Sequence, residues 1–77
     1  METKIKPFKR ITINPKIMLG KPVIKGTRIP VYIVLNMLGE GHDFENIIKT
    51  YPDIKKEDIL ESLKFAAQFT KFEEIAA

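Results

Sequence analysis

The apolar residues of this chain change their spacing at Pro30, and this change constrains the fold more than any other feature. Before Pro30, short β-branched runs at residues 11–13 and 23–24 stand between turns rich in glycine and proline. Such runs are typical of short strands. After Pro30 the apolar residues recur at helical spacing. The sequence therefore predicts a mainly α fold, with a short N-terminal β-hairpin or arm over residues 1–29 and a bundle of three helices over residues 30–77. We expect residues 11–13 to pair with residues 27–29.

Two helices are predicted directly after Pro30. The first ends at the Gly-Glu-Gly turn of residues 39–41, where a glycine can take the left-handed cap conformation. The second begins after Asp43, a good N-cap residue, and ends before Pro52. Each helix repeats apolar residues at i, i+3, i+4 and i+7, and these should face the core: Val31, Val34, Leu35 and Leu38 in the first, and Phe44, Ile47, Ile48 and Tyr51 in the second.

The third helix is predicted to begin near Lys56, with Ile54 and Ile59 placed to form a hydrophobic staple. A short helix, a turn and a longer helix are compatible with a helix-turn-helix. The helix carries two apolar stripes, so it must bury more than one side. The first stripe is Ile59, Leu63, Ala66 and Ala67, the second is Phe65, Phe69 and Phe72, and the acids Glu57, Asp58 and Glu61 are expected to form a solvated face.

The length of 77 residues allows one domain, and a domain this small needs extra stabilisation. Without cysteine there is no disulfide or thiolate zinc site, and His42 is the single histidine. We therefore expect no metal, no cofactor and a homodimer. The first residues lack the pattern of a signal peptide, and no stretch approaches the ~20 apolar residues that span a bilayer. We expect a cytoplasmic protein without membrane contact.

Charge is unevenly distributed along the chain. Residues 1–28 hold eight basic residues against Glu2, a balance of +7, whereas residues 29–77 hold five lysines against nine acids, a balance of −4. A basic segment of this kind is a candidate nucleic-acid surface, although lysines can also simply keep a loop-rich arm soluble. The candidate nucleic-acid-binding residues are Lys4, Lys6, Lys9, Arg10, Lys21, Lys25 and Arg28.

The most distinctive stretch is the twelve-residue run Gly20-Lys-Pro-Val-Ile-Lys-Gly-Thr-Arg-Ile-Pro-Val31. With Gly41, Tyr51-Pro52 and Glu57-Asp58-Ile59 downstream, it resembles the pattern of the domain-of-unknown-function-433 family, often described as VapB-like antitoxins. The resemblance covers roughly residues 11–68. It implies a homeodomain-like three-helix bundle behind a β-arm, and a role in toxin–antitoxin pairs beside a toxin with a PIN-like nuclease fold. Members commonly place Thr or Ser where Lys55 stands, so the cap of the third helix is missing here.

A catalytic function is not expected, because His42 lies in a Gly-His-Asp turn without a nearby nucleophile and no P-loop ending follows Gly26. If the third helix read DNA, the acids at its start would be repelled by phosphate, so the basic arm is the better nucleic-acid surface. Arg28 has an alternative role, an ion pair with Asp43 or Glu61 that fixes the arm to the bundle.

The aromatic stripe also has two interpretations. Phe65, Phe69 and Phe72 either pack in the core or a dimer contact, which we favour, or dock on a partner protein. The resulting hypothesis is an antitoxin-like regulator that binds a PIN-like toxin and operator DNA. The alternative is a protein–protein interaction module that binds no nucleic acid.

Overall fold

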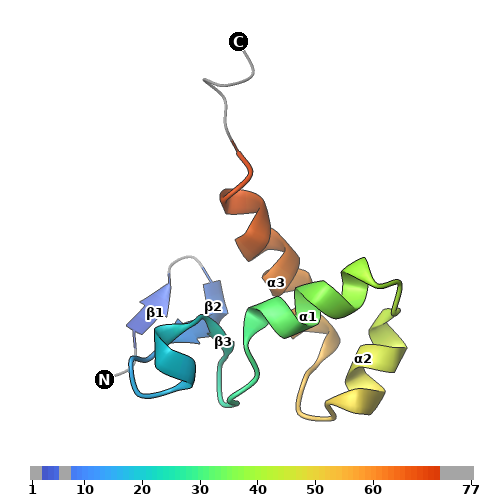
Figure 1. Cartoon of the computed structure of the whole chain (residues 1–77), viewed down its shortest axis with the longest axis horizontal. Coiled ribbons are helices and arrows are strands. Elements are labelled where there is room, and N and C mark those ends of the chain that lie inside the picture. Colours follow the sequence, from blue (N-terminus) through green and yellow to red (C-terminus); the bar gives the residue numbers. More distant parts are fainter. Residues whose placement is uncertain (1–2, 6–7, 72–77) are drawn as a thin grey trace.

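A computed structural model describes residues 3–5 and 8–71 as a small antiparallel sheet beside three helices (Figure 1). The strands β1 (Thr3–Ile5), β2 (Phe8–Ile13) and β3 (Val23–Ile24) lie in the order β1-β2-β3, with a 3-10 turn, η1 (Met18–Gly20), before β3. The helices are α1 (Val31–Gly39), α2 (Phe44–Thr50) and α3 (Lys56–Gln68). The prediction of a mainly α domain with an N-terminal hairpin is confirmed at this level.

The predicted partner of residues 11–13 was wrong. Ile11 pairs with Ile24 and Thr12 with Val23, so the strand beside β2 is β3 and not residues 27–29. Those residues fold back on Ile24, whose N–H donates to the carbonyl of Ile29 at 2.9 Å. The reversal occurs at Gly26, which has a φ of +81° that other residues rarely adopt. The six residues 25–30, with this turn at their start, therefore separate β3 from α1.

The core has two parts, and α1 contributes to both. One cluster joins the sheet to α1 and α3 through Phe8, Ile11, Ile24, Val31 and Phe65, with Leu35 packed against it. The rings of Phe8 and Phe65 meet edge to face, with 5.4 Å between their centroids.

The second cluster fills the space among the three helices. Its buried members are Val34, Ile47, Ile54 and Ile59, and Leu38, Phe44, Ile48 and Tyr51 are among the side chains that pack on them. Together the two clusters contain every residue predicted for the buried faces of α1 and α2, and the staple pair Ile54 and Ile59 is buried as expected.

The predicted helix ends are confirmed. Gly41 follows α1 with a φ of +97°, and the N–H groups of Gly41 and His42 donate to the carbonyls of Leu38 and Met37 at 3.0 Å each. This is the Schellman arrangement that a left-handed glycine permits. At the start of α2, the Asp43 carboxylate accepts from the Asn46 N–H at 2.8 Å.

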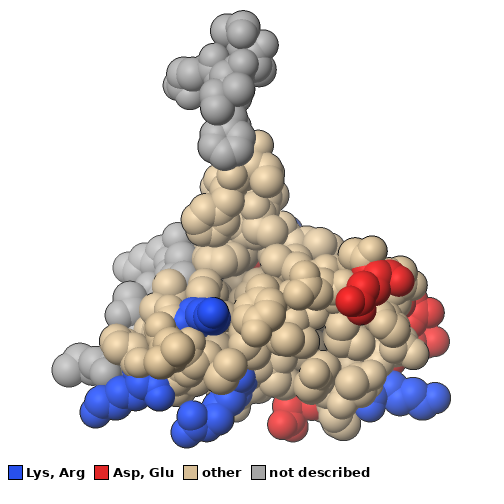
Figure 2. All heavy atoms as spheres, in the orientation of Figure 1, with Lys and Arg blue, Asp and Glu red and all other residues tan. Residues whose placement is uncertain are grey.

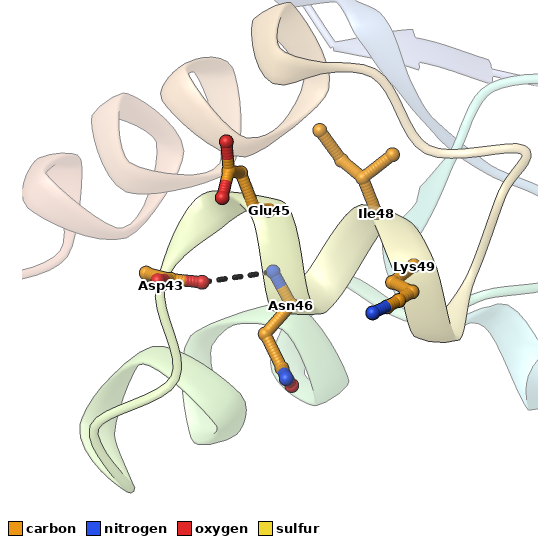
Figure 3. A pocket seen from close by; sticks show the side chains of 5 residues that line it. All are labelled: Asp43, Glu45, Asn46, Ile48 and Lys49. Carbon is orange, nitrogen blue, oxygen red and sulfur yellow. Dashed lines mark hydrogen bonds between the residues drawn. The ribbon is translucent and has the colours of Figure 1, made fainter.

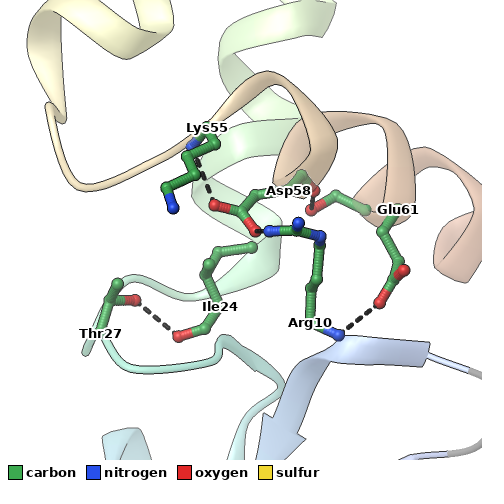
Figure 4. Close-up of polar contacts among 7 residues, drawn as sticks. Arg10, Ile24, Thr27, Lys55, Asp58 and Glu61 are labelled. Atoms are coloured by element: carbon green, nitrogen blue, oxygen red, sulfur yellow. Dashed lines mark hydrogen bonds and ion pairs between the residues drawn. The ribbon is translucent and has the colours of Figure 1, made fainter.

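The start of α3 differs from the expected solvated acidic face. Lys55 supplies no side-chain cap, and the Asp58 carboxylate instead accepts from the Lys55 N–H at 2.8 Å, which is one half of a capping box. Asp58 is buried, and its other oxygen accepts from the guanidinium of Arg10 on β2 at 3.0 Å (Figure 4). Glu61, one turn further on, accepts from the backbone N–H of Arg10. Of the three acids, Glu57 alone is fully on the solvated side.

Two residues of the first predicted stripe of α3 face outward. Leu63 is 42% exposed and Ala67 is exposed, so the stripe drawn through Ile59 and these two was wrong. The buried face runs instead through Asp58, Ile59, Ser62 and Phe65. The difference arises because the buried acid Asp58 and the hydroxyl of Ser62, which donates to the Asp58 carbonyl at 2.8 Å, occupy positions that apolar patterning assigns to solvent.

We expect Asp58→Asn to lower the free energy of unfolding by about 1–3 kcal/mol, because it weakens a buried acceptor shared by a guanidinium and a helix N-terminus. Urea denaturation followed by circular dichroism measures the change. The matched control is Glu57→Gln, which removes the same charge from the neighbouring exposed position and should change stability by less than about 0.5 kcal/mol. Equal effects of the two variants would contradict a structural role for Asp58.

We expect Phe65→Ala to cost about 3–5 kcal/mol, because it empties the space against Phe8 in the first core cluster. Phe69→Ala should cost at most about 1.5 kcal/mol, because Phe69 is 64% exposed and contributes mainly an edge-to-face contact with Phe65. Thermal and urea unfolding of both variants measure the difference. A loss as large for Phe69 as for Phe65 would show that Phe69 is a core residue.

Candidate nucleic-acid interface

Lys25 to Arg28, the first four of the six residues between β3 and α1, form a turn that backbone and side-chain hydrogen bonds hold in one conformation. We call residues 25–28 the basic turn. The Thr27 N–H and hydroxyl both donate to the Ile24 carbonyl, at 3.0 and 2.7 Å, and the Thr27 hydroxyl accepts from the Ile29 N–H at 3.0 Å (Figure 4). Lys25 donates its N–H to the Arg10 carbonyl at 2.7 Å, which fixes the turn to β2.

The structure gives most residues around the basic turn a packing or conformational role. Val23 and Ile24 are buried in the sheet, and Pro30 is buried at the N-cap of α1. Gly26 provides the positive φ, and Thr27 provides the internal hydrogen bonds. Lys25 and Arg28 are the exceptions, because both side chains are exposed. The turn therefore presents two cations on a fixed backbone.

The ion pair considered for Arg28 is not formed. No acid in the described part of the chain pairs with Arg28, since Asp43 caps α2 and Glu61 binds the backbone of Arg10. The residue that fixes the sheet to the bundle is Arg10, through Asp58. Its side chain is nevertheless 41% exposed.

The structure describes the side chains of some, but not all, of the other predicted basic residues. Lys9 on β2 is exposed, and so is Lys21, whose ammonium lies 5.6 Å from the ring centroid of Tyr32 at the start of α1. Lys4 lies on β1, but its side chain is outside what the structure describes, as are Lys6 and Phe72.

Basic and acidic side chains separate on the face seen in Figure 2. Most blue side chains gather over the sheet and its loops at the lower left, and most red ones gather over the end of α1 and over α2 at the right, together with one basic side chain. A further red side chain lies at the bottom centre, beside the blue ones. The charge division along the sequence is therefore also a division across this face. A surface of clustered cations attracts polyanions from a distance of about one Debye length, ~8 Å at physiological salt.

Two hollows lie on the described surface beside α2 and α3. The larger, about 540 Å³, lies along α2 and is lined by Asp43, Glu45, Asn46, Ile48 and Lys49 (Figure 3). Its Asp43 carboxylate is already used as a helix cap. The smaller, about 240 Å³, lies between β2 and α3. Within residues 3–5 and 8–71, no three His, Cys, Asp or Glu side chains are grouped to hold a metal ion.

The aromatic residues predicted as a partner surface are not equivalent. Phe65 is buried against Phe8 and belongs to the core, whereas Phe69 lies at the end of α3 with its ring 5.1 Å from that of Phe65. The exposed leucines of α3, Leu60 and Leu63, were not singled out as a surface. Their i, i+3 spacing was available in the sequence, but the adjacent pair Ile59-Leu60 gives no local sign of which member is buried.

The helices of the described chain are too short and too polar for any of them to cross a membrane.

Comparisons with known proteins agree with the family resemblance drawn from the twelve-residue run between Gly20 and Val31. Residues 11–66 match the family described as "Protein of unknown function (DUF433)". An uncharacterized protein, y4eO, from Sinorhizobium fredii is 39% identical over 49 residues, which are 64% of this chain and 22% of that protein. An uncharacterized protein from Archaeoglobus fulgidus is 65% identical over 24 residues, 31% of this chain and 67% of its own length.

A solved structure shares the fold. The crystal structure of a DUF433 member protein from Anabaena variabilis superposes with a TM-score of 0.72 at 27% sequence identity, covering 77% of this chain and 58% of that one. This chain thus spans only part of the Sinorhizobium and Anabaena relatives. Because the family match includes the basic turn, all three helices up to Ala66 and both core clusters apart from Phe8, the chain belongs to the DUF433 family of proteins of unknown function.

Proposed function

We propose that this domain is a cytoplasmic, antitoxin-like regulator of a toxin–antitoxin pair, and that it binds the backbone of operator DNA through the basic turn. One observation carries the DNA half of this proposal: Lys25 and Arg28 are exposed on a turn whose conformation is fixed by internal hydrogen bonds. Because the backbone of the turn is already fixed, binding of phosphate by these two cations costs side-chain but little backbone conformational entropy. Lys9 and Lys21 extend the same charge over the sheet side of the molecule.

The proposal assigns DNA contact to the turn and not to α3. In a homeodomain-like arrangement, α2 and α3 would be the helix-turn-helix and α3 would read the major groove. The outward side of α3 presents Leu60 and Leu63, which offer no hydrogen-bond donor to a base edge. Asp58 and Glu61, which the sequence suggested would repel phosphate, are turned toward the sheet. The two leucines at the centre of the outer face, rather than the acids, are thus the argument against a reading helix, while Lys56 and Lys64 are exposed beside them.

The toxin half of the proposal rests on the resemblance to antitoxin-like proteins and on the exposed ring of Phe69. The partner is a toxin with a PIN-like nuclease fold, and Phe69 at the end of α3 is the residue placed to dock on it. A binding role without catalysis is part of the same proposal. The lone His42 is exposed beside Glu40, itself exposed, at 3.7 Å, and no nucleophile adjoins them among the described contacts.

A second candidate function is a protein–protein interaction module that binds no nucleic acid. The exposed leucines of α3 favour it, because apolar helix surfaces are typical of protein contacts. The two functions predict different results in a DNA-binding assay. The first predicts binding of duplex DNA that weakens with salt, and the second predicts no binding.

The DNA contact predicts a gel shift with duplex DNA from the region upstream of the gene, with log K falling linearly with log salt. Lys25→Ala/Arg28→Ala should weaken binding and make the slope shallower by about 2, because each lost phosphate contact contributes about 0.9. The matched control is Lys49→Ala/Lys71→Ala, which removes the same charge from exposed positions away from the turn. Absence of a shift at low salt, or an unchanged slope in the turn variant, would leave the interaction module as the function.

The toxin contact predicts that the product of the neighbouring reading frame copurifies with this protein when the two are expressed together. Phe69→Asp should abolish copurification, because a carboxylate would replace an exposed apolar ring at the contact. Leu19→Asp is the control, since Leu19 is the most exposed of the large apolar residues of the described chain and lies on η1. An intact complex with Phe69→Asp would remove Phe69 from the interface, and no complex at all would contradict the toxin half.

A further inference from the structure

The outward face of α3 carries an apolar stripe that no described part of the chain covers. Leu60 is 41% exposed, Leu63 is 42% exposed and Ala67 is exposed. Their spacing of i, i+3 and i+7 places them in one line along the helix. We call these three residues the α3 stripe. The opposite face of the same helix is already buried through Ile59, Ser62 and Phe65, so α3 is apolar on two sides.

We propose that the α3 stripe packs against the α3 stripe of a second copy of this chain, with the two helices antiparallel. Around a two-fold axis, Leu60 of each copy meets Leu63 of the other, and the same patch serves both partners. At the ends of the contact, Ala67 meets the aliphatic stem of Lys56, whose ammonium can remain in water. This contact is separate from the basic turn and from Phe69.

Charge complementarity favours the second copy as the occupant. Glu57 and Lys64 are seven residues apart, so both lie on the same edge of the α3 stripe. When two such helices run antiparallel, equivalent edges face each other, and Glu57 of each copy meets Lys64 of the other. In a parallel pair the same edge would face Ile59 and Ala66, which carry no charge. The stripe therefore complements itself in the antiparallel orientation alone.

The surface beside the α3 stripe also has room for a partner side chain. The hollow of about 240 Å³ is lined by Glu57, Leu60 and Lys64, with Arg10 and Glu61 closing its sheet side. Glu57 and Lys64, which the antiparallel contact pairs with their counterparts in the second copy, both border this hollow. Because the Asp58 carboxylate binds Arg10, the side of the hollow that Arg10 forms is held in position without a partner.

The size of the contact limits its strength. A helix of 13 residues is about 20 Å long, and a pair of such helices covers less than the ~1,200 Å² typical of stable interfaces. We therefore expect a reversible dimer with a micromolar or weaker Kd, populated at high protein concentration.

Sedimentation velocity of the full chain, from micromolar concentrations to about 1 mM, tests the proposal. The wild type should show a reversible monomer–dimer equilibrium, and Leu63→Asp should remain monomeric throughout. Leu19→Asp, an equally drastic change at an exposed leucine on η1, should dimerise as the wild type does. Circular dichroism melting curves confirm that both variants are folded. A monomeric wild type, a larger assembly, or a dimer that survives Leu63→Asp would overturn the proposal.

A charge exchange tests the antiparallel orientation. Glu57→Lys or Lys64→Glu alone should raise the dimer Kd about threefold to tenfold, because each change replaces two attractive pairs by two repulsive ones. The double variant Glu57→Lys/Lys64→Glu should restore the wild-type Kd, since the pairs are then reversed but still complementary. Failure of the double variant to restore dimerisation would overturn the antiparallel arrangement. The free protein could instead stay monomeric while the α3 stripe binds the copurified toxin. This result would contradict the proposal that a second copy of the chain covers the stripe.

Discussion

The carboxylate of Asp58 binds the guanidinium of Arg10 on β2 and the backbone N–H of Lys55 at the start of α3, and this shared acceptor joins the sheet to the helices. Glu61 adds a second link by accepting from the Arg10 N–H. β3 ends at Ile24, which pairs with Ile11, so the Arg10 N–H lies beyond the strand pairing of β2 with β3. A two-residue strand, two carboxylates and one arginine thus set the position of α3, and with it the direction in which the helix faces.

The basic turn depends on this arrangement. Its Lys25 N–H is bound to the carbonyl of the same Arg10 whose N–H and side chain are held by α3. Hydrogen bonds through Arg10 therefore join the turn, β2 and α3 into one unit. Most residues of the twelve-residue run that begins at Gly20 have structural roles in this unit, whereas the side chains of Lys25 and Arg28 are exposed.

The orientation of α3 separates the surfaces that the proposals use. The Arg10 contacts turn Asp58 and Glu61 inward and leave Leu60 and Leu63 outward, so α3 presents an apolar line where a reading helix would present polar side chains. The proposals place nucleic acid at the basic turn, a toxin at Phe69 and a second copy of the chain at the α3 stripe. A small domain can serve several partners when its few exposed features lie on different elements.

The sequence by itself determined what neighbouring residues decide: the break at Pro30, the cap at Asp43, the left-handed Gly41, the staple of Ile54 and Ile59, and the buried faces of α1 and α2. The twelve-residue run between Gly20 and Val31 also indicated the family. Only the tertiary structure decided that β2 pairs with β3, that Arg10 and not Arg28 holds the arm, and that Asp58 is buried while Leu63 is not. The role of Arg10 and the burial of Asp58 depend on residues about 50 positions apart, since Arg10 contacts Asp58 and Glu61. A charged residue is buried where a distant partner supplies the hydrogen bonds that water would otherwise give, and local patterning carries no information about that partner.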